Sequence, residues 1–190
     1  DVSTELIFGL PFETRNNFIK VLNRAIERGF DTVMVHNLLI MHGIEMNRPD
    51  FRKEHGTVTK FRPLGTNYGM HKGNFFAEYE EVVVSTNSFS YKEYLEIRGL
   101  NFMFFTVFNQ NFQRWFFHFI RHMGVSLSKF FSDFLNPDRN TNTKWPKRYL
   151  DFIDDFQNAV EGELHNTKEE VVAEAKKIFL ANNNDVGEAS

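Results

Sequence analysis

The sequence predicts a fold between the α/β and α+β classes, in which a strand–helix–strand unit and two extended pieces precede a helical C-terminal region. Three observations predict it. Apolar runs closed by Gly or Pro flank an amphipathic stretch near the N-terminus. Two β-rich pieces lie in a middle part that is rich in Gly and Asn. In the C-terminal half, apolar residues recur at helical spacing.

The N-terminal unit begins with a strand expected at Glu5–Leu10, an apolar run that leads into Gly-Leu-Pro. Thr14 is a suitable N-cap for the following helix, and Gly29 suits the position just beyond its end. The second strand is expected at Thr32–Met41, which is apolar at odd and even positions alike. Strands that are apolar on both faces belong to covered parallel sheets, so we expect the two strands to be parallel.

The middle part contains two pieces expected to be extended, Val58–Leu64 and Phe75–Thr86. They can pair with each other or add to the edge of the first sheet. The segment between them, Gly65–Asn74, is expected to be a loop because it carries three Gly. Glu80 and Glu81 are neighbours in sequence, so they point apart and are expected on solvated faces.

The C-terminal region is expected to be helical. Ser90 and Glu93 form a capping box for its first helix. Further helices are expected at about Asn111–Met123, Ser126–Leu135, from Pro146 onward, and Thr167–Leu180. The predicted division of the chain is therefore a β/α segment over residues 1–88, a Phe-rich helical region over residues 89–182 and a disordered polar tail over residues 183–190.

The helical region holds eleven of the 23 Phe residues, between Phe102 and Phe134. Their spacing indicates a buried stripe made of Phe104, Phe108, Phe112 and Phe116. The excess of Phe is expected to cover the incomplete sheet or a second subunit, which makes a non-catalytic interaction or homodimerisation domain the alternative function. A membrane-surface helix is disfavoured because the basic residues of this stretch are few.

Composition excludes several classes of function. The net charge of −3 gives no electrostatic case for binding nucleic acid. The absence of Cys excludes disulfides, thiolate zinc sites and cysteine-ligated iron–sulfur clusters within the chain. No uninterrupted apolar segment reaches about 18 residues, so no membrane span is expected, and a cytoplasmic location follows from the lack of a visible secretory signal.

One string is more specific. The segment STELIFGLPFET, followed by an amphipathic helix and VMVHNLLIMHGIEM, resembles the late barrel strands of radical S-adenosylmethionine enzymes that carry a cobalamin-binding domain. The matching positions are Ile7, Gly9, Leu10, Pro11, Glu13, Thr14, Leu39, Ile40, Gly43, Glu45 and Met46. The resemblance departs from the family at His42, where Pro is usual, and at Ile44, where Thr is usual.

The resemblance implies that the chain is a C-terminal remnant of a parallel β/α barrel, begun near its fifth strand. It implies that S-adenosylmethionine is bound in part by Ile7, Gly9, Pro11, Glu13, Leu39 and Gly43. The iron–sulfur cluster and cobalamin belong only to the intact parent, so the chain is not catalytic alone and its catalytic residues are unknown. The expected partners are the missing N-terminal half of the barrel or, through unpaired strand edges, a second copy.

Histidine supplies the remaining candidates. His36, inside the second strand, and His42 and His71, in loops expected near the strand ends, are candidates for contact with substrate. A hydrogen-bonded core histidine is the competing interpretation of His36, and an enzyme that uses the three with an unidentified metal is a third hypothesis. His118 and His122 share a helix face but lack the Glu of a zinc-binding HExxH sequence, so they are interpreted as surface residues and no metal ligand is predicted.

Overall fold

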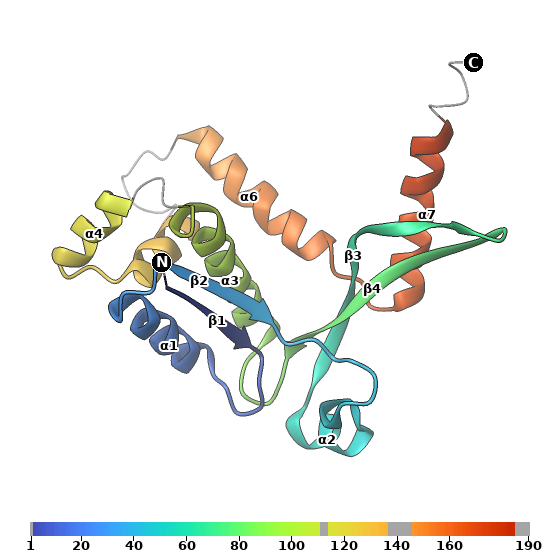
Figure 1. Ribbon diagram of the computed structural model, residues 1–190, viewed down its shortest axis with the longest axis horizontal. Coiled ribbons are helices and arrows are strands. Elements are labelled where there is room, and N and C mark those ends of the chain that lie inside the picture. The colour runs from blue at the N-terminus through green and yellow to red at the C-terminus, as the bar shows by residue number, and fades with distance from the viewer. Residues whose placement is uncertain (1, 111–113, 137–145, 185–190) are drawn as a thin grey trace.

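The computed structural model describes residues 2–110, 114–136 and 146–184 and has a mixed α/β architecture (Figure 1). Within these ranges seven α-helices accompany a parallel pair of strands and an antiparallel ribbon, and no barrel is closed. The elements are β1 (Ser3–Phe8), α1 (Arg15–Glu27), β2 (Thr32–Asn37), the 3-10 turn η1 (Glu45–Asn47), α2 (Pro49–His55), β3 (Val58–His71), β4 (Asn74–Ser85), α3 (Tyr91–Met103), the π-turn η2 (Phe104–Phe108), α4 (Arg114–His122), α5 (Leu127–Leu135), α6 (Lys147–Gly162) and α7 (Lys168–Asn184). None of the helices in the described part is both long and apolar enough to cross a membrane.

The expected strand–helix–strand unit is confirmed, but its first strand, predicted at Glu5–Leu10, begins at Ser3 and ends at Phe8, because the chain turns away at Gly9. β1 pairs with β2 in parallel, with Leu6 opposite Val35. Thr14 caps α1, because its hydroxyl accepts a hydrogen bond from the Asn17 N–H at 3.2 Å. Gly29 has a φ of +85° just beyond the helix, where a left-handed residue ends it.

The second strand is shorter than predicted, because it ends at Asn37. Beyond that residue the chain leaves β1 and runs antiparallel to β4. The Ile40 N–H donates to the Glu81 carbonyl at 2.8 Å, and the Val83 N–H donates to the Leu38 carbonyl at 3.0 Å. The antiparallel ribbon thereby gains a short third strand at Leu39, and this segment joins the two sheets.

The ribbon of β3 and β4 corrects one prediction. The segment expected as a loop, Gly65–Asn74, is mostly strand, since β3 continues to His71 and β4 begins at Asn74. The turn consists only of Lys72 and Gly73, with φ of +49° and +80°. A two-residue turn in which both φ angles are positive matches the right-handed twist of paired strands. Gly73 therefore closes a tight hairpin, and the residues before it stay in the strand.

The last helix lies along the ribbon (Figure 1). The ring of Phe179 in α7 lies 5.5 Å from that of Phe75 in β4. The tail predicted to start at residue 183 is corrected in part, because α7 continues to Asn184, whereas residues 185–190 lie outside the described part. The short helix α2 was not foreseen. It ends at Gly56, which has the left-handed conformation of a helix stop.

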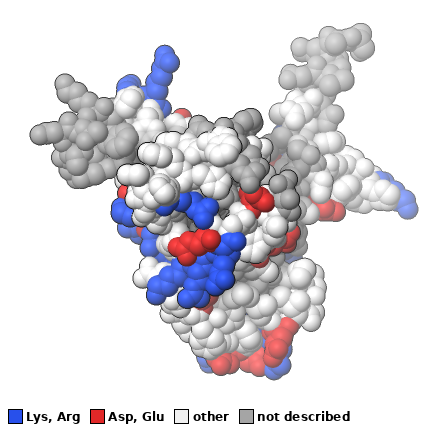
Figure 2. Space-filling model, turned by 60° about the vertical axis from the view of Figure 1, so that its left-hand side comes forward, with Lys and Arg blue, Asp and Glu red and all other residues white. Residues whose placement is uncertain are grey.

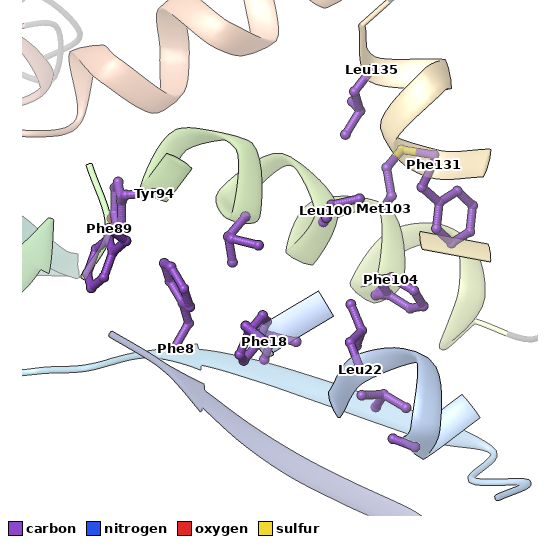
Figure 3. Close-up of a cluster of buried hydrophobic side chains, with 14 of the residues drawn as sticks. Phe8, Phe18, Leu22, Phe89, Tyr94, Leu100, Met103, Phe104, Phe131 and Leu135 are labelled. Carbon is purple, nitrogen blue, oxygen red and sulfur yellow. The ribbon is translucent and has the colours of Figure 1, made fainter. Parts of the chain in front are cut away.

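The core lies between the parallel pair and the helices. Side chains from β1, α1, α3 and α5 converge there (Figure 3). Its largest fully buried members are Tyr94, Phe8, Phe18, Phe104 and Phe131. The predicted capping box of α3 is present, with the Glu93 N–H bonded to the Ser90 hydroxyl and the Glu93 carboxylate bonded to the Ser90 N–H. Among the described residues, these helices cover β1 and β2 on one face, and the side chains on the opposite face are more exposed.

The predicted Phe stripe is only partly right. Phe104 is fully buried and Phe108 is packed against the core, whereas Phe116 is 45% exposed and its neighbour Phe117 is buried instead. Phe112 lies outside the described residues. A single stripe requires one regular helix, and the helix does not continue: the π-turn η2, in which the Asn109 N–H donates to the Phe104 carbonyl five residues back, ends it, and α4 is a separate helix that begins at Arg114.

Glu80 and Glu81 are ion-paired rather than solvated, and their side chains are 19% and 18% exposed. Arg62 contacts Glu80 at 2.7 Å, and Arg52 contacts Glu81 at 2.7 Å. The two carboxylates do point apart, as the strand period requires, but arginines cover both faces of β4 at this position.

Arg62 also approaches Glu163, which accepts a hydrogen bond from Arg98 of α3. This group ties the ribbon to α3 and to the end of α6. Tyr94 lies beside it, and burial raises the pKa of Tyr94 to about 12, an effect that the charge of Arg98 opposes only in part. The hydroxyl of Tyr94 is therefore neutral at neutral pH.

Candidate functional site

The turn that follows β1 is built around Gly9. Its φ is +110°, a conformation that side chains rarely adopt, and a Cβ placed there would lie 3.2 Å from the Cβ of Leu38. Only Gly lets the backbone approach the end of β2 so closely. The chain then turns within Leu10–Glu13, where the Glu13 N–H donates to the Leu10 carbonyl at 3.1 Å. The carboxyl ends of both strands therefore meet at this turn.

Glu13 holds the turn in place. Its carboxylate accepts a hydrogen bond from the Gly9 N–H at 3.1 Å. Burial raises the pKa of Glu13, and hydrogen bonds from the backbone of Gly9 and Leu10 act in the opposite direction. A half-buried carboxylate bonded to the turn's own backbone fits a positioning role better than a catalytic one.

The parallel pair has one uncovered face. Leu6 and Phe8 point toward the helices, whereas Ile7 is 47% exposed on the opposite side. Its cross-strand neighbour is His36, whose side chain is 48% exposed and lies 3.6 Å from the Glu5 carboxylate. The core-histidine interpretation of His36 is therefore wrong. The structure brings Ile7 and His36 together on this face, and it adds Glu5, which the sequence reasoning missed although alternation along the strand places it beside Ile7.

The outer edge of β2 is closed by asparagine side chains. The Asn109 amide donates to the Val33 carbonyl at 2.9 Å and accepts from the Val33 N–H at 3.0 Å. Asn101 donates to the Val35 carbonyl at 2.8 Å. Both side chains occupy the positions at which the backbone of a further strand would bind. No sequence signal that we used points to this role of Asn101 or Asn109.

The outer edge of β1 carries no strand among the described residues. The Val2 and Phe8 carbonyls accept hydrogen bonds at 2.8 Å from the N–H groups of Asp31 and Leu38, on the side of β2. Backbone groups alternate along a strand, so those of residues 3, 5 and 7 point to the other edge. The pair thus has one closed edge and one open edge.

The remaining cofactor-binding candidates lie farther along the chain. Pro11 is partly buried in the turn after Gly9. Leu39 packs against the core and bridges to β4 instead of ending a barrel strand. Gly43 has a φ of +84°, but no atom lies within 4 Å of where its Cβ would be, so it marks an open loop and no close approach.

A groove of about 570 Å³ adjoins the segment after β2. His42 lines it, together with Tyr79 of the ribbon and Lys168 at the start of α7. His71 lies elsewhere, at the tip of the hairpin of β3 and β4. The described residues contain no group of three or more His, Asp or Glu side chains arranged to hold a metal ion. His36, His42 and His71 are therefore not brought together as one site.

Comparison with known proteins adds no assignment, since no protein-family model matches the chain and no curated protein is significantly similar to it.

Proposed function

We propose that this chain is the C-terminal part of a radical S-adenosylmethionine enzyme of the cobalamin-dependent type, and that it supplies part of the adenosyl- and substrate-binding half of a β/α barrel. The observation that carries the proposal is the asymmetry of the parallel pair. Helices cover one face and the β2 edge is closed, whereas no described residue covers the β1 edge or the opposite face. Further strands added at the β1 edge would pair its backbone groups, and the curvature of a barrel would place them over the exposed face that carries Ile7.

The adenosyl group fits the residues that are present. Ligands of parallel α/β sheets bind at the carboxyl ends of the strands, where Gly9 keeps the backbone accessible. Ile7 offers an exposed apolar surface next to that turn, suitable for one face of an adenine ring. Glu13 would hold the turn while the ligand binds, and His36 with Glu5 would face the substrate side.

The metal cofactor does not fit this chain by itself. The sequence has no Cys, so this chain cannot supply the thiolate ligands of an iron–sulfur cluster. Reductive cleavage of S-adenosylmethionine therefore belongs to the part of the parent that holds the cluster. Cobalamin is implied by the resemblance only, and no described side chain is assigned to it.

The test starts from the polypeptide extended by the sequence encoded upstream of Asp1. We expect a CxxxCxxC stretch in that upstream sequence, which would supply the cluster ligands. After reconstitution with iron and sulfide, the extended protein should bind S-adenosylmethionine and release 5′-deoxyadenosine. An Ile7→Asp substitution should weaken binding by about tenfold or more, because it places a charge against the adenine.

Val21→Asp is the matched control. Val21 is 43% exposed on α1, on the helix side of the sheet, so its substitution changes the same chemistry away from the proposed ligand. A start codon directly before the Asp1 codon, or an equal loss of binding in both variants, would contradict the proposal.

A further inference from the structure

The turn after β1 contains a side chain in an unusual backbone conformation. The Glu13 N–H donates to the Leu10 carbonyl at 3.1 Å, which closes a β-turn whose central residues are Pro11 and Phe12. Pro fixes a negative φ at the first central position, whereas Phe12 has a φ of +63° at the second. This combination belongs to a type II turn, in which the second central residue is normally Gly or Asn. A bulky residue such as Phe is strained there.

Neither the turn nor the core requires a Phe at this position. Among the described residues, only Phe12 and Lys72 combine a side chain with a positive φ. The two-residue hairpin accounts for Lys72, because it needs positive φ at both positions. Gly would form the turn at Phe12 without strain, and the ring is not buried in exchange, since it is 78% exposed. Strained residues of this kind are concentrated at functional sites, so Phe12 is a candidate for a role other than folding.

The Phe12 ring is held from the side of α2. Its centroid lies 5.1 Å from that of His55, and the two rings are nearly perpendicular. His55 in turn packs on Phe51, with ring centroids 4.2 Å apart, and both side chains are half-buried. The ring of Phe12 is therefore positioned by a supported neighbour while most of its surface stays open to solvent.

This ring lies where a ligand of the parallel pair is expected. In Figure 1 the turn after β1 and the helix α2 both lie at the end toward which β1 and β2 run. Ligands of parallel α/β sheets bind at that end. The turn is also fixed there, because the Glu13 carboxylate accepts a hydrogen bond from the Gly9 N–H. Backbone, carboxylate and α2 together present the ring beside the carboxyl end of β1.

The surface at this end of the molecule carries little charge on one side. Figure 2 is turned about the vertical axis, so the end with α2 is again the lower one. On the face shown, Lys, Arg, Asp and Glu gather in a central patch and at the extreme lower edge, and the area between them is mostly white. An uncharged planar ring suits such surroundings, because it needs apolar contact rather than an ionic partner.

We propose that Phe12 is a ligand-contacting residue whose ring stacks on the adenine of the adenosyl ligand. The inference rests on the proposed function and deepens it, since it adds an aromatic contact from the turn to the aliphatic one from Ile7 on the strand. It also explains the strain at Phe12: the turn gives up stability in the free protein and gains a contact that exists only when the ligand is bound.

The experiment uses the protein extended by the sequence upstream of Asp1 and reconstituted with iron and sulfide, with S-adenosylhomocysteine as an unreactive probe. Phe12→Gly and Phe12→Asn remove the ring and tolerate the positive φ. Both should raise the Kd of the probe by about tenfold, because stacking of a base on an aromatic ring is lost. Phe12→Gly should at the same time raise the unfolding temperature of the ligand-free protein, because the strain is released. Phe12→Trp keeps an aromatic ring and should bind the probe about as well as the unaltered protein.

Phe76→Asn is the matched control. Phe76 is also an exposed Phe, at 49%, but it lies on β4 and has no positive φ. Its substitution should change neither the Kd nor raise the unfolding temperature. A ring with a purely structural role at Phe12 would give the opposite pattern from the one expected: Phe12→Gly would lower the unfolding temperature and leave the Kd unchanged.

The Ile7→Asp variant separates failure of this inference from failure of the proposed function. If Ile7→Asp weakens binding of the probe and the two ring-free variants do not, the role of Phe12 is overturned and the proposed function stands. If Phe12→Gly lowers the unfolding temperature, the upstream part of the protein buries the ring, and the role of Phe12 is again overturned. If the unaltered extended protein does not bind the probe, the proposed function fails and this inference fails with it.

Discussion

At the scale of single residues, two glycines with positive φ have different roles. Gly9 and Gly43 share the strained backbone, but only Gly9 has a neighbour, Leu38, within contact distance of an added Cβ. The comparison separates backbone strain from steric fit. From the sequence, both are predicted to be turn glycines. The residues next to Gly9 (Leu10 and Pro11) and next to Gly43 (His42 and Ile44) do not indicate which distant side chains pack against each glycine.

Gly9→Ala should lower the free energy of unfolding by about 1 kcal/mol or more beyond the loss caused by Gly43→Ala, because the new methyl group meets Leu38. Urea denaturation of both variants measures the difference. Equal losses would mean that the approach of Gly9 to Leu38 is not close in solution.

The caps were predictable and the exposed face was not. Thr14 and Ser90 act through backbone groups within three residues, so the local sequence determines their bonds. The position of His36 depends instead on which face of β2 the helices cover. An apolar strand conceals that choice, which is why the sequence left a core role and a substrate-side role open for His36.

At the scale of elements, η2 determines how the sheet ends. Its wider turn follows α3 directly, and Asn109 at its end reaches the edge of β2. Regular helical spacing predicts neither the turn nor the contact. Likewise, the second strand was predicted to Met41 because residues 38–41 are apolar. In the structure Leu38–Ile40 pair with β4 instead of continuing β2, and the side chains of Leu38 and Ile40 are buried in the core.

Asn109→Leu should destabilise the protein by about 1–3 kcal/mol, since it leaves the N–H and the carbonyl of the buried Val33 without partners. Hydrogen exchange at the Val33 amide should accelerate. Asn101→Leu is the control, because it removes one bond, to Val35, and should cost less. A slow Val33 amide in the Asn109 variant would show that another group closes this edge.

At the scale of the whole molecule, a few charged groups join the ribbon to the helical part. Arg62 reaches from β3 toward Glu163 at the end of α6, and Arg98 of α3 shares the same carboxylate. Their side chains are mostly buried, so removing one partner and leaving the others uncompensated should cost more than breaking a surface ion pair. The β-α-β unit and the helices follow from local patterns, whereas this long-range junction does not, because its members are distant in sequence.

Glu163→Gln should lower the free energy of unfolding by about 2 kcal/mol, because two arginines lose the charge that they share. Asp133→Asn, which removes the exposed pair with Lys129, should change it by less than about 0.5 kcal/mol. Thermal and urea unfolding of the two variants provide the comparison. Equal effects would argue against a role of the buried group in joining the parts.

The side-chain amides of Asn101 and Asn109, which bond to the edge of β2, also determine at which edge the sheet can be extended. A strand grafted ahead of Ser3 would meet an edge of β1 to which no described strand is paired, whereas the same strand grafted beyond β2 would meet Asn101 and Asn109 already in place. Duplication or fusion of this unit can therefore lengthen the sheet from its N-terminal side only, and two side chains determine which strand comes last.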